Sequence, residues 1–371
     1  MASNKQTEGG RRSYIVCAST LLVAFPDDAP KHLFSDEPNS SKPVAYLFVK
    51  MVQVDIVSTL HILMPKMNSA EYPLLSGRIA AALDIMTSFV GFLITVADDD
   101  IVQGGLTPDR IIKLHEDLAR TVGDVMEYLR DRWDDFLAGS CGIESSQTLE
   151  RSIFEDPITP AAIRFVATWL RDDDGETLRS QAAGLTDLFA ELYKMNLTST
   201  DMPELRLPIL AALEGTLQTS NGRQSFNEHD VWSRCLYTDL RAILINDTSD
   251  LTTVDYLRGS AIMHIVFILI EDNKNLSSHP AAADLLEFIS KMDVKPVKAQ
   301  PETPDRARVD FQADALELAA TLLNDTVRGN ATAQQQKIRN ALKDIAFKVS
   351  KNLEAFNDQS TVARIKELDL G

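Results

Sequence analysis

Two runs of consecutive aspartates are the residues in this sequence that most resemble the metal-binding residues of an enzyme. They are Asp98–Asp100 and Asp172–Asp174, and Mg²⁺ prefers the carboxylate oxygens that such runs offer. A magnesium-dependent enzyme of the terpenoid-synthase type holds a diphosphate with acids three or four residues apart on one helix face. Within each run the acids are adjacent, so they would point around a helix instead of along one face.

A second ligand set of that enzyme type would be an Asn-Asp pair followed by a hydroxyl and an acid. Asn246–Asp247 only approximates this set, because Asp250 stands where the hydroxyl is expected. An all-α small-molecule enzyme is therefore the alternative hypothesis, and it requires Asp98, Asp172 and Asp247 to converge on one cavity. We favour the interpretation that both aspartate runs are solvated turns between helices.

The other candidates for metal or acid–base chemistry are dispersed histidines. No two of them have the spacing of a zinc-ligand pair, and zinc-finger, metalloprotease and phosphate-loop patterns are missing from the sequence. The six histidines are His32, His61, His115, His229, His264 and His279. His264 lies in an apolar segment and is predicted to be a core residue. We assign no catalytic, cofactor-binding or metal-binding residue and expect no cofactor.

The elements that position these residues are predicted to be helices. Apolar residues recur at steps of three and four, most clearly over 108–136, which is the period of a helix with one buried face. Another helix begins at Pro160 and carries Trp169, and an acidic turn separates it from a helix over about 178–192. Trp169 is predicted to be buried, and Asp173 in the turn to be exposed.

Further helices are expected along the rest of the chain, and no segment shows the sustained alternation of a strand. Their ranges are 44–64, 70–97, 203–218, 226–246, 251–271, 280–292, 305–328 and 333–357. Gly77, Gly91 and Gly184 lie inside helical patterns, where glycine costs about 1 kcal/mol relative to alanine. We expect a close approach of neighbouring helices to offset that cost.

The charge balance disfavours nucleic acid and anionic membranes as partners. The 371 residues include 37 basic and 54 acidic ones, a formal net charge of -17, which repels phosphate groups. The apolar stretches Ile85–Ala97 and Ala261–Ile270 are shorter than the roughly 20 residues of a membrane span. The sequence therefore predicts no membrane span.

Cysteine use and the N-terminal segment bear on the compartment. Cys17, Cys141 and Cys235 lie far apart, without the even number or spacing of a disulfide framework, so a reducing, cytoplasmic location is expected. The apolar run Tyr14–Phe25 follows two arginines but is followed by Pro26 and acids instead of a cleavage pattern. It is predicted to be a buried helix.

Helix pairs that follow one another every 35 to 50 residues or so favour an all-α, armadillo- or HEAT-like α-solenoid of irregular helix pairs. An irregular helical bundle has the same local pattern and stays open. The predicted organisation is a disordered terminus at 1–13, the solenoid at 14–292, a proline-containing linker at 293–304, and a C-terminal helical hairpin at 305–371 that packs on or extends the solenoid.

Several segments together resemble the neurochondrin family, in particular its fungal members. They are SGRIAAALDIMTSFVGFLI (76–94), EYLRDRWDDFLAG (127–139), EDPITPAAIRFVATWLRDDDGETLRSQAAGLTDLFAELY (155–193) and LRLPILAALEG (205–215). The resemblance spans roughly residues 14–271. It implies an armadillo-like fold, a cytosolic location, no known catalysis, and an adaptor role like that of the animal relatives. Relatives carry further repeats before the segment that matches Tyr14, so we expect the first helix to expose a face that normally has a neighbour.

The function predicted from these observations is a non-enzymatic scaffold that binds other proteins. The candidate binding surface is acidic and includes Asp172, Asp173 and Asp174, within a larger surface over about 107–271. Such a surface favours partners with basic segments. The oligomeric state and the identity of the partner are not predicted.

Overall fold

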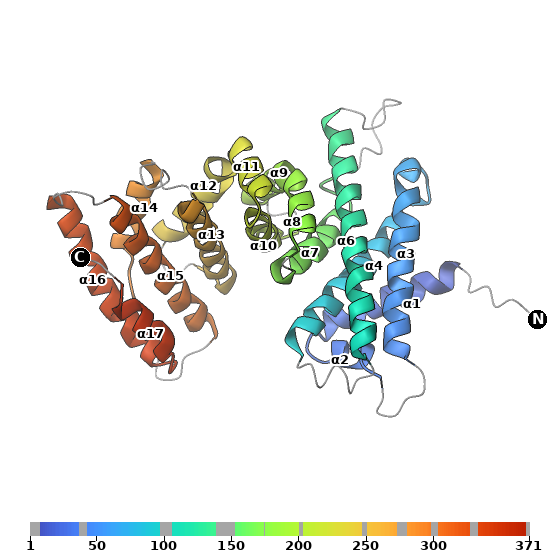
Figure 1. Ribbon diagram of the computed structural model, residues 1–371, viewed down its shortest axis with the longest axis horizontal. Helices are drawn as coiled ribbons and strands as arrows, with labels where there is room; N and C mark the ends of the chain where they lie inside the picture. Colours follow the sequence, from blue (N-terminus) through green and yellow to red (C-terminus); the bar gives the residue numbers. More distant parts are fainter. Residues whose placement is uncertain are drawn as a thin grey trace, which may run out of the picture. The chain divides into compact units, whose positions relative to one another are not determined.

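A computed structural model describes residues 8–36, 43–96, 106–138, 153–173, 175–199, 203–246, 251–272, 280–297, 303–326 and 333–368. All regular structure within these ranges is helical, as Figure 1 shows, so the predicted all-α class is confirmed. Asp174, Asp98–Asp100, Asp247 and Cys141 lie outside the described residues.

The chain divides into two compact units, an N-terminal unit over Met1–Gly222 and a C-terminal unit over Arg223–Gly371. The predicted boundaries at 293–304 stay a prediction. The first helix, α1 (Glu8–Ala24), begins before the predicted end of the N-terminal disordered segment at residue 13. It is a helix, as predicted, and it buries Ile15, Ala18 and Leu22 on one face, whereas Tyr14, Leu21 and Val23 on its other face are exposed.

The helices of the N-terminal unit contact one another in two rows. In the first row, α1 contacts α4 (Tyr72–Thr95), α4 contacts α7 (Ile158–Asp172), and α7 contacts α10 (Arg206–Leu217). In the second row, α3 (Val44–Lys66) contacts α6 (Pro108–Leu137), and α6 contacts α8 (Glu176–Ala182). Contacts between α3 and α4, α6 and α7, and α8 and α10 join the rows. Each helix therefore buries a stripe against its own pair and against the next pair.

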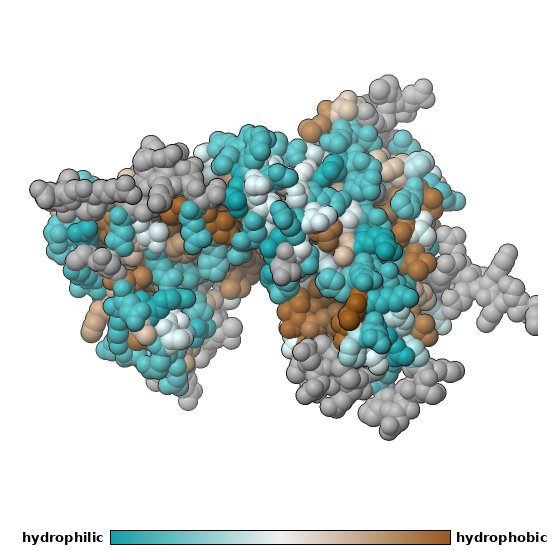
Figure 2. All heavy atoms as spheres, viewed as in Figure 1, coloured by the Kyte–Doolittle hydropathy of each residue, from teal (hydrophilic) through white to brown (hydrophobic). Residues whose placement is uncertain are grey.

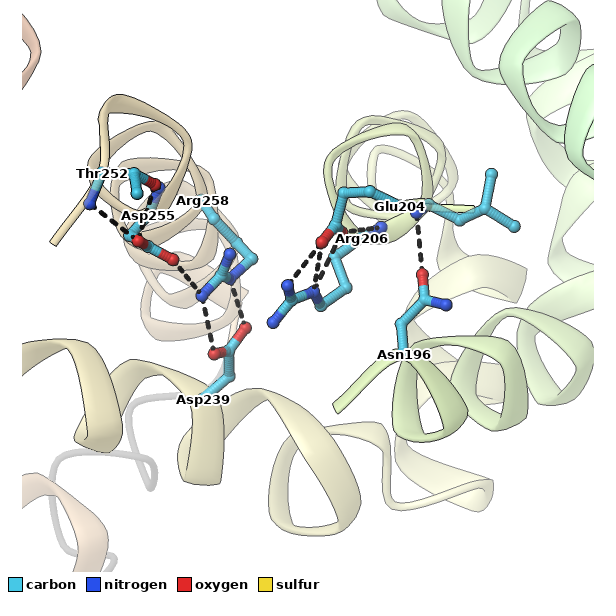
Figure 3. A network of polar contacts seen from close by, with 8 residues as sticks. Asn196, Glu204, Arg206, Asp239, Thr252, Asp255 and Arg258 are labelled. Carbon is cyan, nitrogen blue, oxygen red and sulfur yellow. Dashed lines mark hydrogen bonds and ion pairs between the residues drawn. The ribbon is translucent and has the colours of Figure 1, made fainter. Parts of the chain in front are cut away.

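Short elements complete this unit. The helix α2 (Ala29–Leu33) is followed by Phe34, whose ring lies 5.1 Å from that of Phe89 and 5.7 Å from that of Phe92 on α4. The helix predicted over 178–192 is in fact two, because a 3₁₀ turn at Ala183–Leu185 separates α8 from α9 (Thr186–Thr198). At the end of α9, the side chain of Asn196 accepts a hydrogen bond of 2.7 Å from the backbone N–H of Leu205 (Figure 3). Leu205 directly precedes α10.

A buried polar cluster connects three helices of the N-terminal unit. Asp156, just before α7, accepts hydrogen bonds from the Tyr72 hydroxyl and, at 3.1 Å, from the backbone N–H of Ile158. Arg132 Nη2 lies 3.4 Å from the same carboxylate, and the hydroxyls of Tyr72 and Tyr128 are 3.2 Å apart. Burial and, next, the charge of Asp156 raise the pKa of Tyr128 to about 12. The Tyr128 hydroxyl therefore stays uncharged at neutral pH.

The C-terminal unit repeats the two-row pattern. After α11 (Ser220–Glu228) and a π-helical turn at Trp232–Leu236, one row is α12 (Tyr237–Ile245), α14 (Pro280–Ser290) and α16 (Ala333–Glu354). The other row is α13 (Thr253–Asp272), α15 (Thr303–Thr326) and α17 (Gln359–Lys366). Successive members of each row are in contact, and so are α12 with α13, α14 with α15, and α16 with α17. The sequence missed α17, which Asp358 caps by accepting from the backbone N–H of Thr361.

A buried arginine joins α12 to α13. Arg258 Nε donates to Asp239 Oδ2 at 2.7 Å, and its Nη2 lies 2.8 Å from Asp255 Oδ1, as Figure 3 shows. Burial alone would raise the pKa of Asp255, but hydrogen bonds from Thr252 and the charge of Arg258 hold it below the ordinary value. Asp255 is therefore charged at neutral pH and offsets the charge of the buried guanidinium.

The first part of the predicted linker is packed against the C-terminal unit. Asn352 Nδ2 donates to the carbonyl of Lys295 at 2.9 Å, and Asn352 Oδ1 accepts from the N–H of Val297 at 3.1 Å. Arg308 donates to the same Lys295 carbonyl, and Gln312 donates to the carbonyl of Asp293. Extended backbone at 293–297 thus finds partners on α15 and α16.

Three helices are long and apolar enough to cross a membrane, judged by length and composition alone. They are Val44–Lys66, Tyr72–Thr95 and Thr253–Glu271, and between 44% and 56% of the most apolar window of each is buried inside the structure. The apolar stretches Ile85–Ala97 and Ala261–Ile270 therefore underestimate the length of the apolar helices, which extend well beyond both stretches. Their apolar character is in part explained by packing against neighbouring helices.

Glycine marks close contacts at positions that the sequence did not single out. A Cβ at Gly215 on α10 would lie 2.9 Å from the backbone oxygen of Leu170, and one at Gly259 would lie 2.4 Å from the Phe311 ring. A Cβ at Gly77 or Gly91 would have no neighbour within 4 Å. The expected close approach is therefore wrong for those two glycines of α4.

These contacts predict opposite effects of the same substitution. Gly215→Ala should destabilise the N-terminal unit by about 1–3 kcal/mol, because the α7 backbone must move. Gly91→Ala should stabilise it by about 0.5–1 kcal/mol, because alanine restricts the unfolded chain and meets open space. Urea denaturation followed by tryptophan fluorescence compares the two variants, and equal shifts of the midpoint would contradict the proposed packing of α7 on α10.

Trp169 is buried, as predicted, between α7 and the remainder of the N-terminal unit. Trp169→Ala should destabilise the unit by about 3–5 kcal/mol, because truncation of a large buried ring leaves a cavity. Phe347→Ala is the matched control, since this ring on α16 is 72% exposed and its loss should change stability by less than about 0.5 kcal/mol. Denaturation followed by circular dichroism measures both, and similar midpoints for the two variants would refute the burial of Trp169.

Candidate protein-interaction surface

The two described carboxylates of the acidic turn after α7 differ in orientation. Asp172, the last residue of α7, is exposed, and its Oδ2 accepts from Arg171 Nε at 2.9 Å. Asp173 is different: its side chain is only 12% exposed and its Oδ1 lies 3.9 Å from His115 Nε2 of α6. The His115 ring in turn lies 4.9 Å from that of Trp169. The prediction that Asp173 is an exposed turn residue is therefore wrong, because the turn folds back on α6.

A denser group of acids lies at the C-terminal end of α6. It consists of Glu127, Asp131, Asp134 and Asp135, which we call the α6 acidic stripe; the first three are exposed and Asp135 is half-buried. Their spacing of four, three and one places them along one side of the helix. Partial burial, and then the charges of the other three acids, raise the pKa of Asp131 above its ordinary value against the opposing charge of Arg130. The stripe therefore carries repelling negative charges.

The arginine nearest to this stripe is engaged elsewhere. Arg130 Nη2 donates to the carbonyl of Gln181 at 2.7 Å, where α8 ends. A Cβ at Gly184 would lie 2.3 Å from the same guanidinium nitrogen, so glycine leaves room for the arginine in this position. The Gln181 side chain donates back to the carbonyl of Gly123. The expected close approach at Gly184 is thus present, although it involves a side chain of α6 and not a second helix backbone.

Aromatic side chains lie beside the acidic stripe. The rings of Trp133 and Phe136 are stacked 5.4 Å apart, and Phe154 meets both rings edge-on at 6.3 and 5.3 Å. Trp133 Nε1 donates to Asp187 of α9, and Leu137 is largely exposed. Hydrophobic residues accordingly appear next to hydrophilic ones at this end of α6 in Figure 2. Apolar surface with an acidic border can accept a peptide that carries both basic and apolar side chains.

The alternative enzyme hypothesis finds little support in the described residues. Asn246 lines a cavity of about 440 Å³ in the C-terminal unit, together with Tyr256 and Phe311. Asp293 is the one carboxylate among the described lining residues, which is too few acids for a magnesium diphosphate. No group of three or more His, Cys, Asp and Glu side chains in the described part of the chain could hold a metal ion. Asp98 and Asp247 lie outside the described residues, so their predicted convergence with Asp172 stays a prediction.

His264 is not a core residue, contrary to the prediction. It is exposed on α13, with its Nε2 3.8 Å from Asp314 Oδ2 of α15. Burial raises the pKa of Asp314 and of the neighbouring Glu317, and Arg364 of α17 pairs with Glu317. Ser260 bonds to Asp314, so these polar side chains connect α13, α15 and α17.

The fold and this surface define an all-helical protein whose helices pack in ordered pairs. The family model described as Neurochondrin matches residues 1–291, which is more than half of the chain. The chain therefore belongs to the neurochondrin family.

One curated relative adds a fungal comparison. An uncharacterized protein of Schizosaccharomyces pombe is 26% identical over 142 residues, covering 38% of this chain and 23% of that protein. The chain thus matches about a quarter of the length of this relative. No solved structure matches the chain.

The pKa of Asp131 leads to a prediction about stability and pH. Its folded pKa is raised, so the ionised form destabilises the fold above that pKa and has no effect below the ordinary value of 3.8. Asp131→Asn should therefore raise the melting temperature at pH 7 and leave it unchanged at pH 3. The control Asp172→Asn removes an acid already paired with Arg171 and should not stabilise at either pH. A melting temperature of Asp131→Asn that is unchanged at pH 7 would refute the repulsion.

Proposed function

We propose that this chain is a non-enzymatic scaffold or adaptor of the neurochondrin type, which binds other proteins along an armadillo-like α-solenoid. The observation that carries the proposal is the order of the helix contacts, in which each row of each unit joins every helix to its successor. Stacked helix pairs of this kind present extended faces, and solenoids use such faces to bind partners. Membership of the neurochondrin family supports the same role.

The partner that this surface favours has a basic segment. The α6 acidic stripe lies within the predicted region 107–271, and its acids repel one another: partial burial and then the charges of the other acids raise the pKa of Asp131. A partner's lysines or arginines would supply it. Apolar side chains of the same partner would meet Leu137 and the ring of Phe136. The turn at Asp172, Asp173 and Asp174 remains a second candidate contact, and its Asp172 carboxylate is exposed.

A cytoplasmic location belongs to the same proposal. Cys17 is a free and exposed cysteine, and Cys235 is buried. Free thiols are usual in a reducing compartment. The excess of acid over the whole chain supports protein partners over nucleic acid.

The experiment begins with affinity purification and mass spectrometry of the tagged full chain, followed by titration of one purified partner. We expect Asp131→Lys to weaken binding about tenfold at low ionic strength, with a smaller loss at high salt because the charges are screened. The matched control is Glu354→Lys, an exposed acid of α16 that pairs with Lys366, and it should leave the affinity unchanged. Asp172→Lys tests the turn separately.

The outcomes separate the parts of the proposal. Binding that depends on neither salt nor Asp131 and Asp172 would remove the acidic surface and leave the scaffold. A purified chain that captures no partner, or that turns over a diphosphate substrate in the presence of Mg²⁺, would refute the scaffold itself.

A further inference from the structure

Gln53 of α3 is a buried amide without a hydrogen-bond partner. Only 3% of this residue is exposed, and neither its Nε2 nor its Oε1 has a hydrogen-bond partner in the described part of the chain. An amide that is buried without hydrogen bonds is unfavourable, because it loses its bonds to water and gains none in the fold. Buried polar groups are almost always bonded, so a side chain with both its donor and its acceptor unused points to a function.

Gln53 lines a groove between α3 and α6, which we call the α3–α6 groove. The two helices are in contact in the second row of the N-terminal unit (Figure 1), and the groove has a volume of about 270 Å³. Val54 and Val57 of α3 line it, and so does Thr121 of α6. This volume is smaller than the roughly 300–1,000 Å³ of a typical small-molecule pocket. It therefore suits a short stretch of a peptide that continues along the surface.

The charged residues that line the α3–α6 groove are two cations and one acid. They are Lys50, Arg120 and Asp117. Lys50 Nζ pairs with Asp117 Oδ2, and Arg120 Nη1 lies 3.6 Å from Asp117 Oδ1. The two cations thus share one carboxylate, and the Arg120 side chain is 74% exposed. In a chain with a net charge of -17, this lining is complementary to an acidic side chain.

We propose that the α3–α6 groove binds an extended acidic segment of a partner protein. The Gln53 carboxamide bonds to the backbone of the segment, and Arg120 pairs with one of its Asp or Glu side chains. A carboxamide has an acceptor oxygen and a donor NH₂ group, and a peptide backbone offers an N–H and a C=O in return. A simple ion would satisfy only one side of the amide. Val54 and Val57 then contact an apolar side chain of the segment.

This inference rests on the proposed scaffold function and adds a second site with the opposite charge preference. The α6 acidic stripe lies toward the C-terminal end of α6, whereas Asp117 and Arg120 of the groove lie in its N-terminal half. A partner that binds the stripe through basic side chains therefore need not occupy the groove.

The first test is the stability of Gln53→Leu. Leucine has a similar size and needs no hydrogen bond, so we expect the melting temperature of the full chain to rise. The matched control is Thr59→Val on the same helix, which removes the acceptor of a 3.0 Å hydrogen bond from Arg78 Nη2 and should lower the melting temperature. A lower melting temperature of Gln53→Leu would assign Gln53 a structural role and overturn the inference.

The second test is selection of a phage-displayed library of random dodecapeptides on the immobilised full chain. We expect enriched peptides to contain Asp or Glu. Gln53→Leu and Arg120→Glu should each weaken binding of a synthetic enriched peptide by about tenfold, as measured by fluorescence anisotropy. The control Lys348→Glu makes the same charge reversal as Arg120→Glu at an exposed residue of α16, and it should leave the affinity unchanged.

The outcomes also separate this inference from the scaffold proposal. The inference is overturned if no enriched peptide distinguishes the wild-type chain from Gln53→Leu, or if the enriched peptides bind Arg120→Glu equally well. Self-association of the full chain that Gln53→Leu abolishes would assign the groove to a second copy and overturn it as well. A purified partner whose binding depends on Asp131 but not on Gln53 would leave the scaffold standing without this groove.

Discussion

The carboxylate of Asp156 is the interaction on which the N-terminal unit most depends. It lies before α7 and receives a hydroxyl from α4, a guanidinium from α6 and a backbone N–H of α7 itself. The helices that it joins belong to both rows, so it fixes how one row sits on the other. A buried charge of this kind is tolerable only when every partner is present, and it therefore selects one arrangement of the three helices over others that would bury the same apolar area.

The same helix shows how folding leaves charge available for function. In the segment 127–135 the two arginines turn inward, Arg132 to Asp156 and Arg130 to the last carbonyl groups of α8. The acids of this segment are exposed or half-buried, and partial burial and mutual repulsion raise the pKa of Asp131. Four acids already outnumber the two arginines in the segment, and its surface is more acidic still. An acidic surface thus arises because the arginines of this segment bond to groups inside the unit, whereas the acids remain in solvent.

The sequence by itself determined the helical class, the buried apolar face of α6, the burial of Trp169 and the resemblance to the neurochondrin family. These depend on the local period of apolar residues and on short segments. It did not determine the inward turn of Asp173, the exposure of His264, the break between α8 and α9 or the close contact at Gly215. Each of these depends on which helix lies opposite, and residues such as Gly184 and Arg130, 54 positions apart, meet only after folding. Local pattern specifies which residues a helix can bury, whereas tertiary packing decides which charges remain outside to bind a partner.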